Sequence, residues 1–449
     1  MNRRIVIGRI MSKRWLLLSL LFTIHYSCVP AVASEQSSSA LFTASAQQKP
    51  CGTSVLTRHR EAKALHRALG EGNVANYQGA KRGLIILVDF PDQPFSDDDA
   101  KVQWSAIANE HHYSGYKAIG SVADYFRDQS YGQFELSFDV VGPVTMQHEF
   151  AYYGKNIDWG NDDWFDGKVD EMVEEACRGV CDSVHFSDYD WDGDGVVEEV
   201  FLLYAGHGED DYWRINEDVI WPHMGSLSID WNREQGLLLQ DCRIDIYACS
   251  NEINKKDEIT GIGTICHEFS HCLGLPDLYD TQKGISVLGM YDLMDSGNRG
   301  GGGWVPTGYS SYERYACGWL TPEPIDDPMT IDSLAPLHLK PDVRFYQDLD
   351  YSFAYYLIEN RVAESWDVSL PSHGLMVWCI DYNERDWKEN VVNSYDGRRR
   401  VDRIQLSDIP TAISTPSADV HPVAVYTISP GLYIIKYSDG TTKKIVCQN

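Results

Sequence analysis

The 449-residue sequence predicts a mixed α/β (α+β) domain followed by a smaller β-rich domain. Residues 83–90 form an apolar, β-prone run closed by Pro91, which is typical of a buried strand. Helical and strand-like runs then alternate as far as about residue 320, at 121–128, 134–144, 163–177 and 199–204. Beyond residue 321 the pattern changes to short strand-like runs separated by turn residues, at 353–359, 374–380 and 432–437.

Length and composition bound the classes of protein that fit. The chain is too long for one ordinary domain, and its 43% hydrophobic and 12% aromatic content is ample for a large core. Its formal net charge of -28 argues against a nucleic-acid-binding protein, because such proteins need clustered cations to displace counterions from phosphates. The acidity is more typical of an extracellular protein that binds cations.

The N-terminus has the three parts of a secretory signal peptide. Five basic residues precede an apolar run at 15–24, and Ala31-Val32-Ala33 has the small-x-small pattern of a cleavage site. We therefore expect residues 1–33 to be removed and the protein to be secreted or held at the cell surface. The apolar run is too short for a permanent membrane span. A lipoprotein anchor at Cys28 is disfavoured because no aliphatic residue stands at the expected place before it.

The segment from His267 to His271 matches the HExxH pattern. On a helix, histidines four residues apart project from the same face and can bind one zinc ion. Glu268 is not needed as a ligand, so it is free to take a proton from zinc-bound water and deliver it to the leaving amine. The motif predicts hydrolysis of a peptide bond with Glu268 as the general base.

A third zinc ligand is expected from the residues that follow. Gly274 can end the helix in a left-handed conformation and Pro276 prevents it from resuming, so the chain can turn back and bring Asp277 to the metal. Two imidazoles and one carboxylate would leave the fourth position open for water. Asp280, which is close in sequence, and Glu313, on a further expected helix, are the alternatives.

The extended motif is specific. HExxH alone is expected by chance in roughly one chain of this length in a hundred, and requiring the glycine and the aspartate lowers that by about two further orders of magnitude. Downstream, the run from Gly289 to Gly297 resembles the Met-turn that lies below the zinc in metzincins, with Met294 as its methionine. The alternative is a methionine that only fills the core.

A second candidate metal site is the acidic loop at residues 190–198, which matches the first nine positions of an EF-hand loop. Hard oxygen ligands at alternate positions suit calcium. Position twelve is Phe201, so no bidentate glutamate closes the loop and position nine must supply the last carboxylate. A metal-free acidic turn is the alternative, although so many carboxylates would repel one another without a cation. The expected calcium ligands are Asp190, Asp192, Asp194, Val196 and Glu198.

Several separate blocks, in the same order, resemble the immune inhibitor A family of secreted bacterial zinc metallopeptidases. These blocks are residues 82–92, 121–126 and 130–132, the acidic loop, the zinc motif, 317–320, 356–361 and 375–381. The resemblance implies an endopeptidase with a metzincin-like fold, an N-terminal pro-segment and bound calcium. Cys379 departs from the family pattern, where a histidine is expected, which puts any role of that position in doubt. The tail at 431–445 is similar to the end of sorting domains used in Bacteroidetes-type secretion.

We therefore expect a signal peptide at 1–33, a polar pro-segment at 34–80, a metallopeptidase domain at 81–320 and a β-rich domain with a sorting-type tail at 321–449. The predicted function is that of a secreted zymogen of a zinc-dependent, calcium-stabilised endopeptidase acting on proteins or peptides. An extracellular binding or adhesion protein on a peptidase fold, with weak or no activity, is the alternative. The intact Glu268 argues against it. Ten cysteines remain after cleavage, and they can pair or stay as buried thiols.

Overall fold

The structure is a computed structural model of the chain, and it describes most of residues 77–405. The gaps within that range are 159–163, 210–217, 229–235, 326–328, 332–333, 348–353 and 396. Outside it, only the strands at 5–9, 422–429, 432–437 and 442–447 are described. The apolar run and cleavage site of the expected signal peptide, and nearly all of the expected pro-segment, lie outside the described residues.

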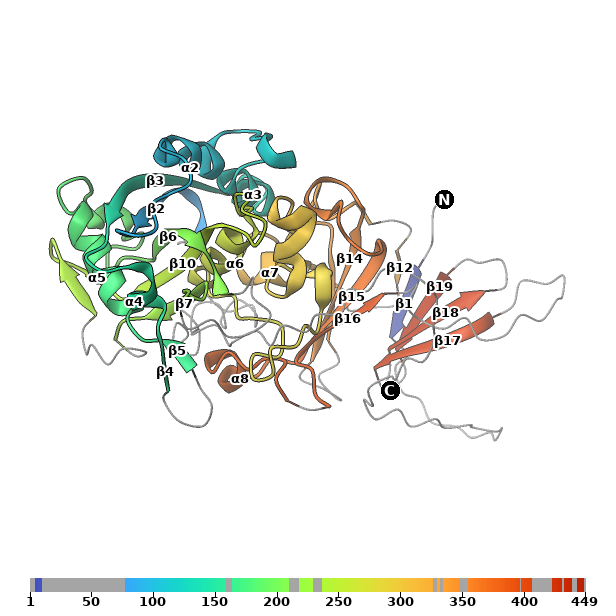
Figure 1. Ribbon diagram of the computed structural model, residues 1–449. Helices are drawn as coiled ribbons and strands as arrows, with labels where there is room; N and C mark the ends of the chain where they lie inside the picture. The colour runs from blue at the N-terminus through green and yellow to red at the C-terminus, as the bar shows by residue number, and fades with distance from the viewer. Residues whose placement is uncertain are drawn as a thin grey trace.

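A five-stranded sheet, in the order β3-β2-β6-β10-β7, forms the centre of the first part of the chain (Figure 1). Its strands are β2 (Gly79–Asp89), β3 (Phe134–Thr145), β6 (Val200–His207), β7 (His223–Ser226) and β10 (Ile246–Ile253). The first four strands in that order are parallel, and β7 pairs antiparallel at the edge. The apolar run predicted as a buried strand is confirmed as part of β2, which has a neighbour on each side.

Helices cover both faces of this sheet. They are α2 (Ala100–Asn109), α3 (Val122–Gln129), α4 (Phe150–Gly154), α5 (Val169–Val180) and α6 (Gly263–Cys272). Successive residues of β2 point to opposite faces, so Ile85 and Leu87 pack in the core formed with α2, α3 and α6, while Leu84, Ile86 and Val88 pack against α5. Figure 1 shows α2 and α3 above the sheet and α6 between β10 and α7.

Helix α6 is fixed on one side by close backbone contact and on another by aromatic packing. A Cβ atom on Gly263 would lie 1.8 Å from the carbonyl oxygen of Asn298, so only glycine allows this approach. Phe269 packs on another side of the helix, with its ring centroid 5.2 Å from that of Phe138 and 5.6 Å from that of Phe126. The face of α6 that carries the predicted metal ligands is thereby given one orientation.

A second five-stranded sheet, in the order β11-β13-β14-β15-β16, follows helix α7 (Ser311–Ala316). Its strands are β11 (Glu323–Pro324), β13 (Arg344–Gln347), β14 (Tyr355–Arg361), β15 (Gly374–Ile380) and β16 (Val401–Gln405). Leu357 and Trp378 belong to the same hydrophobic cluster as Ile85 and Phe269. The two sheets therefore share one continuous core, and the domain boundary at residue 320 stays a prediction.

Smaller strands complete the described structure. Two hairpins are formed by β4 (Asn156–Asp158) with β5 (Trp164–Asp166) and by β8 (Leu237–Leu239) with β9 (Cys242–Ile244). A third sheet has the order β12-β1-β19-β18-β17, with β1 (Ile5–Arg9), β12 (Met329–Ile331), β17 (Pro422–Ser429), β18 (Leu432–Tyr437) and β19 (Thr442–Cys447). The strand predicted at 432–437 is confirmed as β18. The sorting function of this tail stays a prediction.

Helix α5 begins later than the sequence predicts. The acidic helix was expected from residue 163, but residues 164–166 form β5, which pairs with β4, and the helix begins only at Val169. Pairing within the β4–β5 hairpin thus takes precedence over helix propensity at the start of this run. The edge strand β7 and helix α2 were not predicted at all.

Three cysteines in the hydrophobic clusters on the two faces of the central sheet are thiols. Cys177, Cys249 and Cys266 form no disulfide and are buried, and burial raises the pKa of each thiol well above its usual value. For these three, the alternative of buried thiols holds. Among the described residues, none of the helices is both long and apolar enough to cross a membrane.

Candidate metal centre

The two histidines of the HExxH motif lie on α6 with their ring orientations fixed by backbone carbonyls. Nδ1 of His267 donates to the carbonyl oxygen of Leu293 at 2.8 Å, and Nδ1 of His271 donates to that of Leu275 at 2.7 Å. A carbonyl accepts only from an N–H, so each neutral ring carries its proton on Nδ1 and leaves the lone pair of Nε2 for a metal. In its neutral form, each imidazole therefore has the tautomer that zinc ligation requires.

Asp277 meets these two rings. Gly274 has a φ of 83°, so the predicted left-handed end of α6 is confirmed, and the chain returns toward the helix. Oδ1 of Asp277 lies 3.0 Å from Nε2 of His267 and 3.5 Å from Nε2 of His271. Two ligand atoms at about 2.0–2.1 Å from a tetrahedral zinc ion are about 3.3–3.4 Å apart, so these separations fit one shared ion.

The burial of the three groups is consistent with that fit. His267 is 4% exposed, His271 1% and Asp277 0%. Nε2 of His271 is buried and has no hydrogen-bond partner among the described residues. A buried polar atom without a hydrogen bond is costly, and a cation at this point would satisfy it.

The carboxylate also determines the charge of the neighbouring ring. Burial lowers the pKa of His267, but the hydrogen bond to Asp277 and the negative charge of Glu268 outweigh it and raise that pKa to about 9. For Asp277, burial opposes ionisation, but the two imidazoles hold its pKa well below the usual value. Near neutral pH the cluster therefore holds a proton at His267 that an incoming metal ion would displace.

Glu268 lies beside the proposed ligands, but its carboxylate is farther from the imidazole of His271 than that of Asp277 is. One of its oxygens, Oε2, is 3.9 Å from Nε2 of His271, and the ligand atoms of His267, Glu268 and His271 all lie within 4.8 Å of one another. The side chain is 7% exposed. A carboxylate at this distance is within reach of a water molecule that occupies the fourth coordination position.

The two alternative third ligands have local hydrogen-bond partners. Asp280 accepts hydrogen bonds from the backbone N–H groups of Gln282 and Lys283, at 3.1 Å each. It thus stabilises the turn that follows the loop carrying Asp277. Glu313 caps helix α7, where its Oε2 accepts from the N–H of Ser310 at 2.6 Å. Both carboxylates are therefore engaged in local turns and caps.

Met294 is fully buried in the segment that supports the metal ligands. Its carbonyl accepts the N–H of Leu278 at 2.8 Å, next to Asp277, and the carbonyl of the preceding Leu293 holds His267. The turn at Leu293 and Met294 thus contacts both helix α6 and the loop that carries Asp277. The assignment of this segment as a metzincin-type Met-turn stays a prediction.

The acidic loop brings the side chains of Asp190, Asp192 and Asp194 together, with one carboxylate oxygen of each within 4.8 Å of the others. Backbone N–H groups turn inward, since Gly193 and Gly195 donate to Asp190 at 2.8 Å. The buried Glu198 accepts from the N–H of Trp191 at 2.7 Å, and the N–H of Val196 donates to Asp194 at 2.9 Å. The loop leads directly into β6 of the central sheet.

Sequence reasoning missed three supports of the site. The carbonyl groups of Leu293 and Leu275 carry no signal in the sequence, because any residue supplies a carbonyl. Asn390 donates from Nδ2 to Oδ2 of Asp277 at 2.6 Å, although the two residues are 113 positions apart. Only a structure or a comparison of many sequences relates such distant positions.

Two carboxyl groups are buried beneath the turn of Met294. Oδ1 of Asp292 accepts the N–H of Met294 at 2.9 Å, while its Oδ2 and Oε1 of Glu313 have no hydrogen-bond partner among the described residues. Burial raises the pKa of Asp292 to about 7, and burial together with the charge of Asp292 raises the pKa of Glu313 well above its usual value. Part of this pair is therefore protonated below neutral pH.

Comparisons with known proteins agree with the family resemblance. The profile of a family described as immune inhibitor A peptidase M6, catalytic domain, matches residues 73–319. A pre-pro-metalloprotease PrtV of Vibrio cholerae serotype O1 is 26% identical over 267 residues, which cover 51% of this chain and 29% of the relative. Immune inhibitor A of Bacillus thuringiensis subsp. alesti is 24% identical over 266 residues, which cover 51% of this chain and 38% of its own length. The chain thus spans about a third of the length of these relatives.

The buried carboxyl pair predicts a pH dependence of stability. Asp292 has a pKa of about 7 in the folded protein against the usual 3.8 of an aspartate, so between these values the folded state binds a proton that the unfolded state has released. The contribution of this group to stability therefore falls as pH rises from about 4 to about 7, by at most about 1.4 kcal/mol per pH unit. Urea unfolding in one metal buffer should show Asp292→Asn gaining stability relative to the unmutated protein between pH 5 and pH 8. A stability difference that does not change with pH would contradict this.

Proposed function

Because the chain belongs to the immune inhibitor A family of M6 peptidases and is a metallopeptidase by that membership, we propose that it is a secreted zinc-dependent endopeptidase. The observation that carries the proposal is the approach of one carboxylate oxygen, Oδ1 of Asp277, to Nε2 of both His267 and His271. In this proposal these three residues bind zinc on a metzincin-like fold, and Glu268 is the catalytic base.

Each residue has a separate part in the mechanism. Bound zinc would supply a Lewis acid that polarises the scissile carbonyl and lowers the pKa of water from 15.7 to about 7. Glu268 would accept the proton of the attacking water and pass it to the leaving amine. The carbonyl oxygens of Leu293 and Leu275 keep Nδ1 of each histidine protonated, so that Nε2 of both rings points to the metal.

Secretion, activation and substrate class belong to the same proposal. The basic, apolar and small-residue succession at the N-terminus supports a signal peptide, and the polar segment at 34–80 supports synthesis as a zymogen. Proteins or peptides are the substrates that membership of a peptidase family implies. An adhesion protein without activity is not favoured, because loss of the base is the simplest route to an inactive peptidase and Glu268 is present.

We further propose that the acidic loop binds calcium and has a structural role. Three aspartates whose ligand atoms lie within 4.8 Å repel one another unless a cation is shared between them. The N–H of Val197 donates to the carbonyl of Arg243 at 2.9 Å, which ties the end of the loop to the β8–β9 hairpin. Calcium would thus stabilise the entry to β6 rather than take part in chemistry.

The first test separates metal binding from chemistry. Glu268→Gln keeps the three zinc ligands but cannot accept a proton, so hydrolysis of a denatured protein substrate should fall about 10²–10⁴-fold while the zinc content stays near that of the unmutated protein. His271→Ala should lose zinc and activity together, because two ligands hold the ion poorly. Undiminished proteolysis by Glu268→Gln would remove the basis of the mechanism.

The second test concerns calcium and uses the melting temperature. Free calcium at about 100 times its Kd would add about 2.7 kcal/mol to the free energy of unfolding, so the melting temperature should rise with calcium concentration. The double variant Asp192→Ala, Asp194→Ala should not show the rise. Asp98→Ala, Asp182→Ala removes two exposed carboxylates elsewhere and should respond like the unmutated protein. An equal response of all three proteins would exclude calcium binding at this loop.

A further inference from the structure

A short segment of the β-rich region holds the loop that carries Asp277. Asn390 bonds to Asp277, and Nδ2 of Asn393 donates to the carbonyl of Leu278 at 2.8 Å. One position further along, Oγ of Ser394 accepts the N–H of Thr281 at 3.0 Å. Residues 390–394 and 277–281 thus run side by side, buried and bonded through both backbone and side chains. The family profile ends at residue 319, before this segment.

Asn390 contacts Asp277 through both ends of its amide. The backbone N–H of Asp277 donates to Oδ1 of Asn390 at 2.8 Å, and Nδ2 of Asn390 donates to Oδ2 of Asp277 at 2.6 Å. The other carboxylate oxygen, Oδ1, is the one that lies 3.0 Å from His267 and 3.5 Å from His271. The amide therefore decides which oxygen faces the imidazoles, and it fixes the carboxylate rotation about the bond to Cβ.

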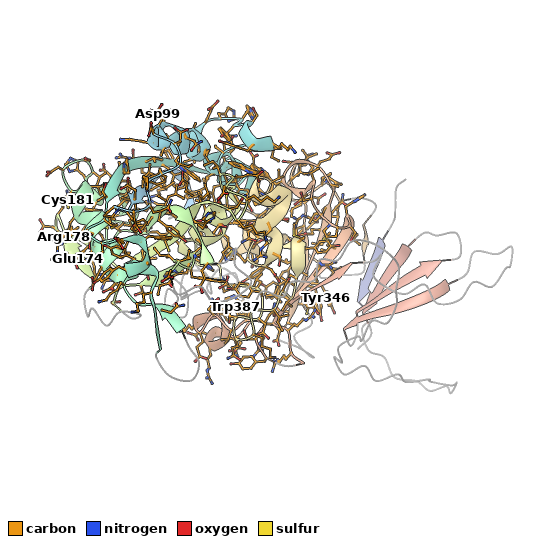
Figure 2. The ribbon with its side chains drawn as sticks, in the orientation of Figure 1. Asp99, Glu174, Arg178, Cys181, Tyr346 and Trp387 are labelled. Atoms are coloured by element: carbon orange, nitrogen blue, oxygen red, sulfur yellow. The ribbon has the colours of Figure 1, made fainter. Side chains whose placement is uncertain are left out.

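The position of Asn390 is itself enforced by its surroundings. Its φ is 49°, in the left-handed region, which asparagine tolerates better than most residues but which still costs free energy. The preceding helix α8 (Glu384–Lys388) is anchored by Trp387, which Figure 2 labels. Its Nε1 donates to the hydroxyl of Tyr312 on α7 at 2.7 Å. Asp386 of the same helix accepts from Nε of Arg400 at 2.6 Å. The β-rich region thus presents the amide rigidly to the metal loop.

We propose that Asn390 is a positioning residue for the metal, which holds Oδ2 of Asp277 so that only Oδ1 is available as a ligand. Asp277 then binds in a monodentate manner, and the fourth position stays open for water instead of being taken by the second carboxylate oxygen. The metal site thereby depends on a residue outside the expected peptidase domain. This inference rests on the proposed zinc site.

The test measures zinc affinity in the full chain by competition with a chelator of known affinity. Asn390→Gly removes the amide and relieves the left-handed φ, so the backbone is not strained further. Its zinc Kd should rise about 10–100-fold, the range found when partners of metal ligands are removed. Asn390→Ala, which keeps the strain, should show at least as large a rise. With cobalt in place of zinc, the visible absorption of Asn390→Gly should weaken as the second oxygen joins the metal.

Asn109 provides the matched control. Its amide also bonds in both directions to one residue across two elements, with Oδ1 accepting the N–H of Phe138 at 2.7 Å and Nδ2 donating to its carbonyl at 2.9 Å. Asn109→Ala should lower the melting temperature of the metal-free protein and leave the zinc Kd unchanged. An equal loss of zinc affinity in Asn109→Ala would show that Asn390 acts only through general stability and would overturn the inference.

Failure of this inference can be told apart from failure of the proposed function. If Asp277→Ala loses zinc affinity while Asn390→Gly binds as tightly as the unmutated protein, Asp277 is a ligand and the role of Asn390 is wrong. If Asp277→Ala binds zinc normally, the proposed ligand set is wrong and the inference fails with it. An unchanged cobalt spectrum in Asn390→Gly would likewise contradict the monodentate role.

Discussion

The buried carboxylate of Asp277 is the group on which the proposed site depends. It lies in the interior at 0% exposure, where an ionised carboxylate is stable only if charges and hydrogen bonds surround it. On one side stand the imidazoles of His267 and His271, and on the other the amide of Asn390. Each neighbour also has a second partner that fixes its own orientation, so the carboxylate joins helix α6, the loop after it and the β-rich region.

The core that the two sheets share gives the carboxylate of Asp277 the rigid support it needs. A metal ligand held from both sides needs both sides to be rigid, and the cluster that contains Phe269 behind α6 also contains Trp378 of β15. Arg361 of β14 adds a buried connection, since its guanidinium donates to the carbonyl of Gly308 at 2.8 Å and is paired with Asp367. The β-rich region therefore acts as part of the scaffold of the site.

Local signals in the sequence predicted the parts of the structure that depend on neighbouring residues. The HExxH spacing is set by the helical period, and Gly274 with its φ of 83° ends the helix as its lack of a side chain allows. The apolar run of β2 and the strand β15 at 374–380 were predicted for the same reason. Contacts outside the local pattern were out of reach: pairing with β4 makes residues 164–166 the strand β5 instead of the start of the helix, and the bond between Asn390 and Asp277 spans 113 positions.

X-ray absorption at the zinc edge of the zinc-loaded protein tests the ligand assignment most directly. Two imidazole nitrogens at about 2.0–2.1 Å, with the outer scattering of their rings, and oxygen ligands at about 2.0–2.2 Å from Asp277 and water are predicted. Asp277→Ala leaves only the two imidazoles as protein ligands, so under the same loading it should lose most of its zinc and with it this spectrum. Scattering from sulfur at about 2.3 Å, or from a single imidazole, would contradict the account.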